Sequence, residues 1–380
     1  MYPQPAPRAE LLIDVGAIQS NLTLLAERAH RSGARTMAVV KADGYGHGAI
    51  TVARAALTSG ADCLGVASVG EALELRAAGI TAPVLCWLHA SGEDFAPAIS
   101  ADIELSASSV GGLRAIGGAA AGLGRTARVH LKIDTGLNRN GCSPAQWAEL
   151  VDEAAKAQAD GVLDVVAVCS HLACADELGH PSIDMQARRF AQAYEQARAA
   201  GLRPLRHLAN SAATLTRPDL HFDLVRPGIA VYGLDPVPQH GNHGLRPAMT
   251  FRSSVSLVKR VPAGESVSYG HAWTASEETT LALVPVGYAD GVPRSLSGRI
   301  TVWVHGERRP QVGRMCMDQL VVDCGDLPVQ EGDEVVLFGP GDRGEPTATE
   351  WAGELGTIHY EIVTGMYRPR VARTAVGAVP

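Results

Sequence analysis

The sequence predicts an α/β protein in which an N-terminal (β/α)8 barrel is followed by a C-terminal all-β domain. Between about residues 36 and 232, short β-branched apolar runs alternate with alanine-rich segments whose apolar residues recur at helical spacing. After about residue 243 the long helical segments disappear, and valine and threonine alternate with polar residues. The length of 380 residues, 46% of them hydrophobic and 19% charged, is enough for two packed domains.

Eight candidate strands can be placed in the first part of the chain. They cover residues 36–40, 63–67, 84–88, 103–106, 129–133, 165–170, 205–207 and 224–230. Helices are predicted among them at 47–60, 69–80, 143–158 and 184–202, where apolar residues recur every three or four positions. Eight parallel strands, each followed by a helix, form a (β/α)8 barrel, although a doubly wound open sheet uses the same elements in another order. We favour the barrel.

Two domains are expected, at residues 1–243 and 244–380, with DPVPQHGNHGLRP as the linker between them. Runs such as FRSSVSLVKRVP and RITVWVHGERRPQVG predict strands in the second domain. One more strand-like run, residues 10–14, precedes the barrel strands. Residues 1–14 are therefore candidates for packing on the second domain.

Composition and charge restrict the class of function. The formal net charge is −7 and no lysine- or arginine-rich block occurs, so we expect a small-molecule partner and no nucleic acid. The seven cysteines show no CxxC pairing and no dense, even spacing, so we expect no metal site and a reduced, cytoplasmic protein. The first nine residues, MYPQPAPRA, lack the apolar core of a signal peptide and are expected to form a loose tail. No run of 18 apolar residues predicts a membrane span.

Polar residues occur on or just past the predicted barrel strands, where barrel enzymes place their active sites. Lys41 follows the first strand within the stretch VVKADGYGHG. Five more accompany the fifth to eighth strands: Arg139, His171, Asn210, Ser211 and Arg226. We expect these groups to converge on one rim of the barrel.

Lys41 allows two interpretations from its position alone. A lone lysine at a strand end can extend its ammonium group into water. An amine desolvated at the mouth of an apolar barrel instead has a lowered pKa and can attack an aldehyde to form a Schiff base. Such a lysine suits an aldolase or a pyridoxal phosphate enzyme. Residues 210–211 and 226–229 supply hydroxyl and backbone N–H donors where barrels commonly bind phosphate, which favours the cofactor.

The chain resembles the alanine racemase family, whose members are fold-type III pyridoxal phosphate enzymes. The similar stretches include VVKADGYGHG, LKIDTGLNRNG, HLANSAA, LVRPGIAVYG, SVSYGHAWTA, PVGYADGVPR, VGRMCMDQ and HYEIVTGMYRPR. They span both domains in order, from near the N-terminus to about Arg370. The resemblance implies an isomerase that interconverts L-alanine and D-alanine by a two-base mechanism through a pyridoxal phosphate external aldimine. It also implies a homodimer with shared active sites, and a role in supplying D-alanine for peptidoglycan.

The resemblance also implies roles for single residues around the cofactor. Lys41 would hold the cofactor covalently, and Arg226 would face the pyridine nitrogen, with His171 and His207 holding that arginine in place. An arginine there keeps the ring nitrogen unprotonated, which limits side reactions such as transamination. The remaining cofactor-binding residues, most of them around the phosphate, would be Tyr45, Asn210, Ser211, Gly228, Ile229 and Tyr360.

Racemisation needs a proton donor and acceptor on each face of the substrate carbon. By resemblance, Lys41 would serve D-alanine and Tyr269 of the partner subunit would serve L-alanine. Arg139 and the backbone N–H of Met317 would bind the substrate carboxylate. Lys132 matches a position that is carbamylated in some relatives, and an ion pair with Asp134 or another carboxylate is the open alternative.

Other functions compete with the racemase. Fold-type III decarboxylases share the lysine-bearing barrel and the β domain, but they usually place a glutamate where Arg226 stands. Broad-specificity racemases are typically exported, and no signal peptide is expected here. A pyridoxal phosphate carrier or an aldolase would have no use for a complete second domain with Tyr269.

Overall fold

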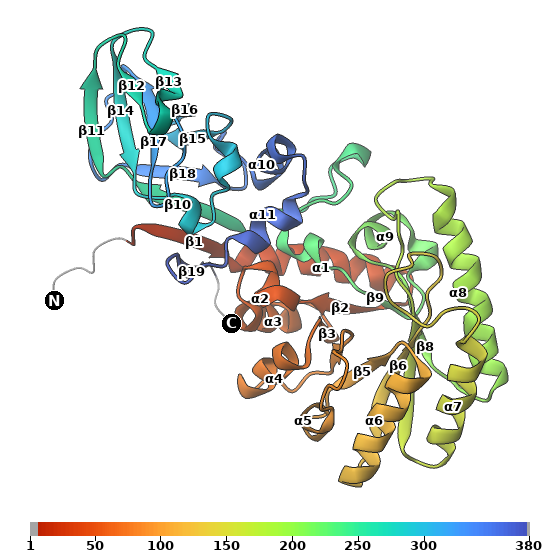
Figure 1. The fold of residues 1–380 in the computed structure, drawn as a ribbon. Helices are drawn as coiled ribbons and strands as arrows, with labels where there is room; N and C mark the ends of the chain where they lie inside the picture. The colour runs from red at the N-terminus through yellow and green to blue at the C-terminus, as the bar shows by residue number, and fades with distance from the viewer. Residues whose placement is uncertain (1–6, 378–380) are drawn as a thin grey trace. The chain divides into compact units, whose positions relative to one another are not determined.

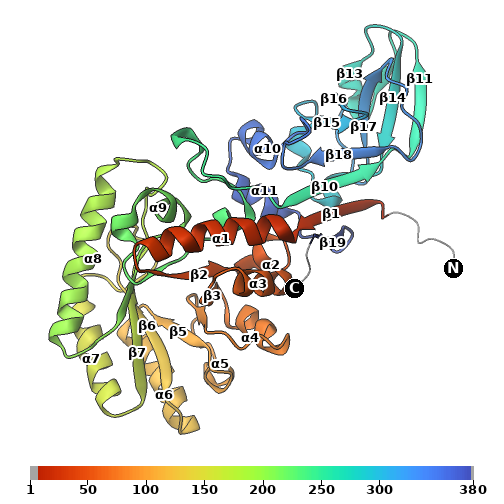
Figure 2. The same cartoon turned by 180° about the vertical axis from the view of Figure 1, so that it is seen from behind.

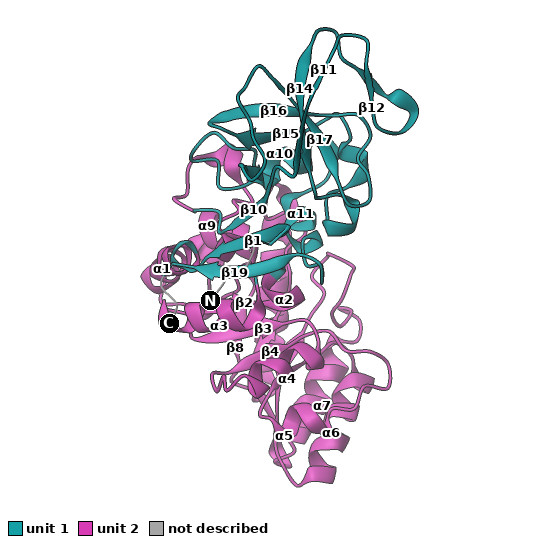
Figure 3. Cartoon of the chain, turned by 90° about the vertical axis from the view of Figure 1, so that its left-hand side faces the viewer, with its two compact units in different colours: residues 1–17, 45–47, 246–379 teal, residues 18–44, 48–245, 380 magenta. Residues whose placement is uncertain are grey.

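The structure is a computed structural model that describes residues 7–377. The chain forms two compact units, which Figure 3 shows in different colours. The barrel unit contains residues 18–44 and 48–245. The sheet unit contains the described parts of residues 1–17, 45–47 and 246–379.

The barrel unit is built on eight parallel strands (Figure 1). In chain order these are β2 Arg35–Val39, β3 Cys63–Val66, β4 Val84–Cys86, β5 Glu104–Ala107, β6 Ala127–Lys132, β7 Leu163–Cys169, β8 Leu205–His207 and β9 Leu224–Val225. Each strand from β2 to β7 pairs with the next along the chain, and β9 pairs with β2. The backbone N–H of Asp223 donates to the carbonyl of Arg206 at 3.1 Å, which brings the two edges together. This order confirms the predicted barrel and excludes the doubly wound sheet.

The strand predicted over residues 224–230 is wrong in its second half. Strand β9 ends at Val225, and a 3-10 turn, η2, follows over Ile229–Tyr232. Proline has no N–H for the strand ladder, so Pro227 stops the pairing. The interruption leaves Arg226 at the C-terminal end of the strand and the backbone N–H groups of 228–230 free to face a side chain or a ligand.

Helices connect the barrel strands, and α6, α7 and α8 lie along the outer face of the barrel in both views (Figures 1 and 2). The helices of this part of the chain are α1 Val15–Arg31, α2 Lys41–Tyr45, α3 Ala49–Thr58, α4 Val69–Ala77, α5 Ala96–Ser100, α6 Val110–Leu123, α7 Trp147–Ala159, α8 Pro181–Ala199 and α9 Ser211–Thr216. Local sequence sets their ends. Ser68 begins α4 with a capping box, in which its hydroxyl accepts from the Glu71 N–H and the Glu71 carboxylate accepts from the Ser68 N–H.

The sheet unit holds a nine-stranded sheet in the order β11-β14-β17-β16-β15-β18-β10-β1-β19. Its strands are β1 Ala9–Asp14, β10 Met249–Ser254, β11 Leu257–Val261, β14 Thr279–Val284, β15 Thr301–Val304, β16 Glu307–Val312, β17 Leu320–Gly325, β18 Glu334–Phe338 and β19 Ala372–Val376. A small ribbon of β12 Ser266–Val267 and β13 Trp273–Thr274 stands beside it. The predicted β domain is confirmed, and two short helices, α10 Ala348–Leu355 and α11 His359–Gly365, are added to it.

Strand β1 lies between the first and the last long strands of the C-terminal part of the chain, β10 and β19. It pairs antiparallel with β10 and parallel with β19, and the Glu10 carboxylate accepts from the Arg252 guanidinium at 2.8 Å. Residues 1–6 of the expected loose tail lie outside the described residues. The rest of that tail is held: Arg8 donates to the fully buried carboxylate of Asp290 at 2.9 Å, and Ala9 begins β1.

Each unit has its own apolar core. Trp147, Phe190 and Tyr232 are buried in the barrel unit. In the sheet unit the ring of Phe338 contacts those of Phe251 and Trp351, with centroids 5.9 and 5.1 Å apart. Among the helices of the described residues, none is both long and apolar enough to cross a membrane.

Candidate active site

Lys41 lies two residues past the end of the buried strand β2 and begins an unusual left-handed turn. Ala42, Asp43, Gly44 and Tyr45 all have φ between 51° and 61°. This conformation costs each L-residue about 1–2 kcal/mol of conformational free energy, so such a run must be stabilised by its surroundings. The support comes from hydrogen bonds: the Gly44 N–H donates to the Val40 carbonyl at 2.9 Å, and the Asp43 carboxylate accepts from the Ala49 N–H at 2.9 Å.

The Lys41 amine is partly buried among charged and aromatic groups. Burial lowers its pKa, the positive charge of Arg139 lowers it further, and Glu71 opposes the shift. The Nζ atom lies 6.0 Å from the centre of the Trp87 ring. The Glu71 carboxylate accepts from the Ala42 N–H at 2.7 Å, which fixes the start of the turn beside the lysine. An amine in this environment loses its proton more readily than a solvated lysine.

Arg226 lies at the C-terminal end of β9 and is held by several groups. Its guanidinium contacts the Nδ1 atom of His207 at 2.9 Å and donates to the Ser170 carbonyl at 2.8 Å. The Nδ1 atom of His171 lies 3.4 Å from it. Burial and the surrounding cations hold the pKa of both histidines well below its ordinary value. Both imidazoles are therefore neutral at pH 7, and the positive charge stays on the arginine.

Ser211 stands at the start of α9 and faces the turn after β9. Its side-chain oxygen accepts from the N–H groups of Gly228 at 2.8 Å and Ala230 at 3.3 Å. Asn210 is the N-cap of α9, where its side chain accepts from the Ala213 N–H. In this structure the Gly228 and Ala230 N–H groups donate to Ser211, and such N–H groups beside a hydroxyl are the kind of donors that bind an anion.

Lys132 ends strand β6 and is partly buried. Burial lowers the pKa of Lys132, and the charges of Arg226 and Arg139 lower it further. None of the ion pairs within residues 7–377 involves Lys132, and the Asp134 carboxylate instead accepts from the backbone N–H groups of Gly136 and Asn138. The negative charge of Asp134 acts on the pKa of Lys132 in the opposite direction, so both alternatives for Lys132 stay predictions. Arg139 is exposed on the loop after β6.

Four of the predicted site residues belong to the sheet unit: Tyr45, Tyr269, Met317 and Tyr360. The rings of Tyr45 and Tyr360 lie 6.2 Å apart, and burial raises the pKa of the Tyr45 hydroxyl. Tyr269 and Met317 are 69% and 52% exposed, which is unusual for such large side chains. Tyr269 begins a short 3-10 turn between β12 and β13, next to Ser268, whose hydroxyl donates to the Arg314 carbonyl at 2.6 Å.

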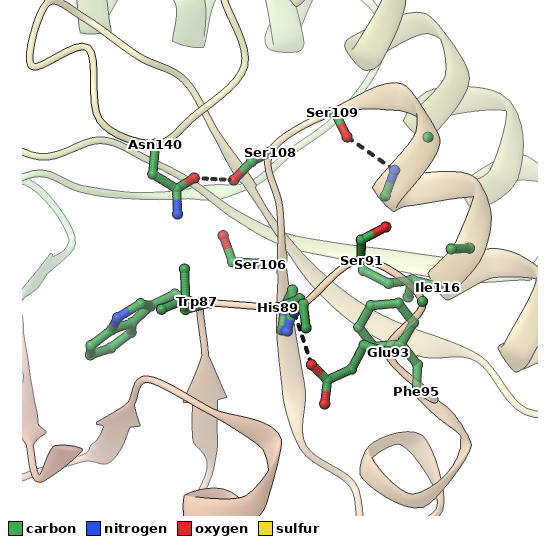
Figure 4. Close-up of a pocket in the computed structure, with 16 residues that line it drawn as sticks. Trp87, His89, Ser91, Glu93, Phe95, Ser106, Ser108, Ser109, Ile116 and Asn140 are labelled. Atoms are coloured by element: carbon green, nitrogen blue, oxygen red, sulfur yellow. Dashed lines mark hydrogen bonds between the residues drawn. The ribbon is translucent and has the colours of Figure 1, made fainter. Parts of the chain in front are cut away.

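Sequence reasoning missed a cavity of about 380 Å³ at the ends of β4 and β5 (Figure 4). Trp87, one of its lining residues, also lies beside the Lys41 amine. The Ser108 hydroxyl donates to the Asn140 side chain across the cavity at 2.8 Å, and Ser106 lines it with its hydroxyl unpartnered within the described residues. The signal for Trp87 was its place at a strand's C-terminal end, inside the run predicted as residues 84–88.

Sequence reasoning also missed Glu104 and His130, which lie inside strands β5 and β6. They are 5% and 2% exposed and contact each other at 2.9 Å. Buried polar residues in barrel strands are unusual, but in a four- to six-residue strand they resemble ordinary alternation of polar and apolar positions.

The chain is similar to known proteins along nearly its whole length. The family model described as "Alanine racemase, N-terminal domain" matches residues 13–236, and "Alanine racemase, C-terminal domain" matches residues 248–375. The alanine racemase of Mycobacterium avium (strain 104) is 56% identical over 373 residues, which cover 97% of this chain and 95% of that protein. That of Frankia casuarinae is 57% identical over 361 residues, or 94% of each protein. The crystal structure of alanine racemase from D-cycloserine producing Streptomyces lavendulae superposes with a TM-score of 0.95, at 51% identity, over 99% of this chain and 98% of that one.

Proposed function

The chain belongs to the alanine racemase family, and from this premise we propose that it interconverts L-alanine and D-alanine with pyridoxal phosphate as cofactor. The observation that carries the proposal is the placement of Lys41: a partly buried amine with a lowered pKa, at the C-terminal end of a barrel strand. Arg226, held at the end of β9, is the second support.

The side chains of the barrel unit fit this cofactor. Lys41 has the lowered pKa that attack on an aldehyde requires. Ser211 and the N–H groups around Gly228 and Ile229 suit a phosphate, with Asn210 fixing the start of α9. When bound, the cofactor withdraws electrons from the substrate's Cα so that its proton can leave.

We propose that Arg226 keeps the pyridine nitrogen of the cofactor unprotonated. A guanidinium does not give up its proton near neutral pH, so it can donate a hydrogen bond to the ring nitrogen but cannot protonate it. His171 and His207 lie beside Arg226 as neutral imidazoles. A ring that remains unprotonated withdraws electrons less strongly, which suits an enzyme that must return the proton to the same carbon.

Two bases are proposed to move the proton. Lys41 takes or returns it on the face used by D-alanine, and Tyr269 does so on the face used by L-alanine. Arg139 and the Met317 N–H are proposed to hold the substrate carboxylate, and a guanidinium suits that group because two N–H donors match its two oxygens.

The remaining assignments rest on the family. Tyr45 and Tyr360 are proposed to bind the cofactor phosphate, and Lys132 is proposed to carry a carbamate that orients Arg139. Tyr269 and Met317 are proposed to act on the cofactor of a second copy of the chain, which makes a homodimer part of the mechanism. The high exposure of both side chains supports this. Seven free thiols suit a reducing, cytoplasmic location, and the product D-alanine would serve peptidoglycan synthesis.

The experiment is chiral analysis of the products formed by the purified protein from each common L-amino acid, combined with borohydride reduction. We expect D-alanine from L-alanine without release of CO₂, and a reduced cofactor adduct on Lys41. Lys41→Ala should abolish both the adduct and the activity, whereas Lys156→Ala, on the outer helix α7, should keep them. Release of CO₂ or an adduct on another residue would contradict the proposal.

A further inference from the structure

A buried network of Glu104, His130, His207 and Arg226 crosses the interior of the barrel unit. The Glu104 carboxylate lies 2.9 Å from the Nε2 atom of His130. The Nδ1 atom of His130 lies 2.8 Å from the Nε2 atom of His207, and the Nδ1 atom of His207 lies 2.9 Å from the Arg226 guanidinium. Glu104, His130 and His207 are 5%, 2% and 1% exposed, so protein atoms alone satisfy these contacts.

The direction of every hydrogen bond in this network follows from its arginine end. A guanidinium has only donors, so the Nδ1 atom of His207 must accept. A neutral imidazole carries one proton, so His207 carries it on Nε2 and donates to the Nδ1 atom of His130. By the same argument His130 carries its proton on Nε2 and donates to Glu104. All contacts are satisfied only when both histidines are Nε2–H tautomers.

The carboxylate end of the network supports the same assignment. Arg128 contacts the other oxygen of Glu104 at 2.7 Å, and the pKa of Glu104 is lowered because the hydrogen bond from His130 and the charges of Arg128 and Arg76 outweigh the effect of burial. Glu104 is therefore ionised and can only accept. At the other end, burial and, after it, the charge of Arg226 lower the pKa of His207 and so disfavour a proton on both of its nitrogens.

We propose that Glu104 and His130 are positioning residues for Arg226, and that they act by fixing the tautomer of His207. With Nδ1 of His207 held as an acceptor, the guanidinium has a defined orientation toward the cofactor. The network also cannot pass a proton toward the pyridine ring of the cofactor. A proton on Nδ1 of His207 would face an N–H group of Arg226, and two donors cannot form a hydrogen bond. This inference rests on the proposed function, in which Arg226 faces the pyridine nitrogen.

The first test is ¹⁵N NMR of the full chain labelled at histidine, with and without pyridoxal phosphate. His130→Phe and His207→Phe assign the two signals. We expect both residues as Nε2–H tautomers, because only this arrangement satisfies every contact of the network, and we expect His207 not to titrate between about pH 6 and 8, because burial lowers its pKa. An Nδ1–H tautomer, or titration of His207 within this range, would overturn the proposal. Since this readout does not need the cofactor, it is separate from the test of the proposed function.

The second test compares Glu104→Gln with Glu104→Leu. Both variants remove the charge, but the glutamine carbonyl still accepts from His130 and leucine does not. We expect Glu104→Gln to keep both tautomers and a kcat within about threefold of the wild type, while Glu104→Leu mixes the tautomers and lowers kcat about tenfold with little change in KM. Equal behaviour of the two variants would show that charge, and not tautomer, matters.

A matched control is available at His221, which is equally buried and whose Nε2 atom lies 3.0 Å from the Thr214 carbonyl, outside the network. His221→Phe should change neither the signals of His130 and His207 nor kcat. If Glu104→Leu does not fold, the wild-type tautomers and Glu104→Gln still decide the question: loss of the Nε2–H tautomer in Glu104→Gln would contradict the proposal.

Discussion

Lys41 and Arg226 are two cations of the barrel unit that differ in whether they can lose a proton. Both are partly buried cations, and burial lowers the pKa of each. Lysine starts from a pKa near 10.4, so a lowered value makes the neutral amine accessible, while arginine starts too high to lose its charge. One of the two can therefore exchange protons during turnover. The other supplies a fixed charge.

The proposed second base is tested with Tyr269→Phe. Because L-alanine and D-alanine have equal free energies, the equilibrium constant is one and any variant must change kcat/KM equally in both directions. Proton abstraction itself is not restricted in this way, so the measurement is exchange of the Cα hydrogen with D₂O. We expect exchange from L-alanine to fall by about 100-fold or more and exchange from D-alanine to change far less.

Tyr367→Phe is the control for this experiment, because Tyr367 is a similarly exposed tyrosine, at 61%, in the same unit. It should exchange both enantiomers at the wild-type rate. Equal losses of exchange from L-alanine and D-alanine in Tyr269→Phe would contradict the two-base mechanism.

At the residue scale, the sequence could reveal some site residues and not others. Lys41 and Arg226 could be found because a charged residue directly after an apolar strand is a local signal. Tyr269 came only from the family resemblance, since an exposed tyrosine in a turn has no chemical signature. Glu104 and His130 were missed because their pairing depends on which strands become neighbours, and one strand's sequence does not contain that information.

At the scale of elements, the left-handed turn after β2 explains the glycines of VVKADGYGHG. Gly46 has φ near +81°, and a β-carbon there would lie 2.5 Å from the carbonyl oxygen of Val363 in α11. The glycine thus permits close approach of two segments that carry Tyr45 and Tyr360. The sequence indicated a sharp turn here. It could not show that Ala42 and Asp43 also adopt left-handed conformations, because those residues rarely do so.

Gly46→Ala tests this close approach, with Gly33→Ala as its matched control. Gly33 has a similar φ of +76°, but a β-carbon there would meet nothing within 4 Å. We expect Gly33→Ala to lower the free energy of unfolding by about 1 kcal/mol through backbone strain alone. Gly46→Ala should lower it by about 2 kcal/mol more, because the backbone of α11 must shift. Urea unfolding measures both, and equal losses would contradict a role for the contact.

At the scale of the whole molecule, the sheet unit depends on residues that are distant in the sequence. Strand β1 lies between β10 and β19, so residues from both ends of the chain complete one sheet. The change from helical to alternating patterns near residue 243 reveals two kinds of structure. It does not reveal that residues 9–14 pair with 249–253 and 372–376, because pairing partners are set by the whole sheet.

Buried neutral histidines make the stability of the protein depend on pH. The pKa values of His89, His171, His207 and His221 are all lowered, mainly by burial. Below pH 6.5 the unfolded chain binds protons at these residues and the folded chain does not, so acid favours the unfolded state. We expect the free energy of unfolding to fall as pH drops from 7.5 to 5.5. Each fully buried histidine contributes up to roughly 1.4 kcal/mol per pH unit below about 6.5.

Urea midpoints at pH 7.5, 6.5 and 5.5 measure this dependence. Carboxylates with lowered pKa values, such as Glu104 and Asp290, act only below about pH 4.5 and do not contribute in this range. His207→Gln removes one of the titrating groups, so its stability should fall less steeply with acid even though it is less stable at pH 7.5. A stability that is constant or rises toward pH 5.5 would contradict the assignment of neutral histidines inside the barrel.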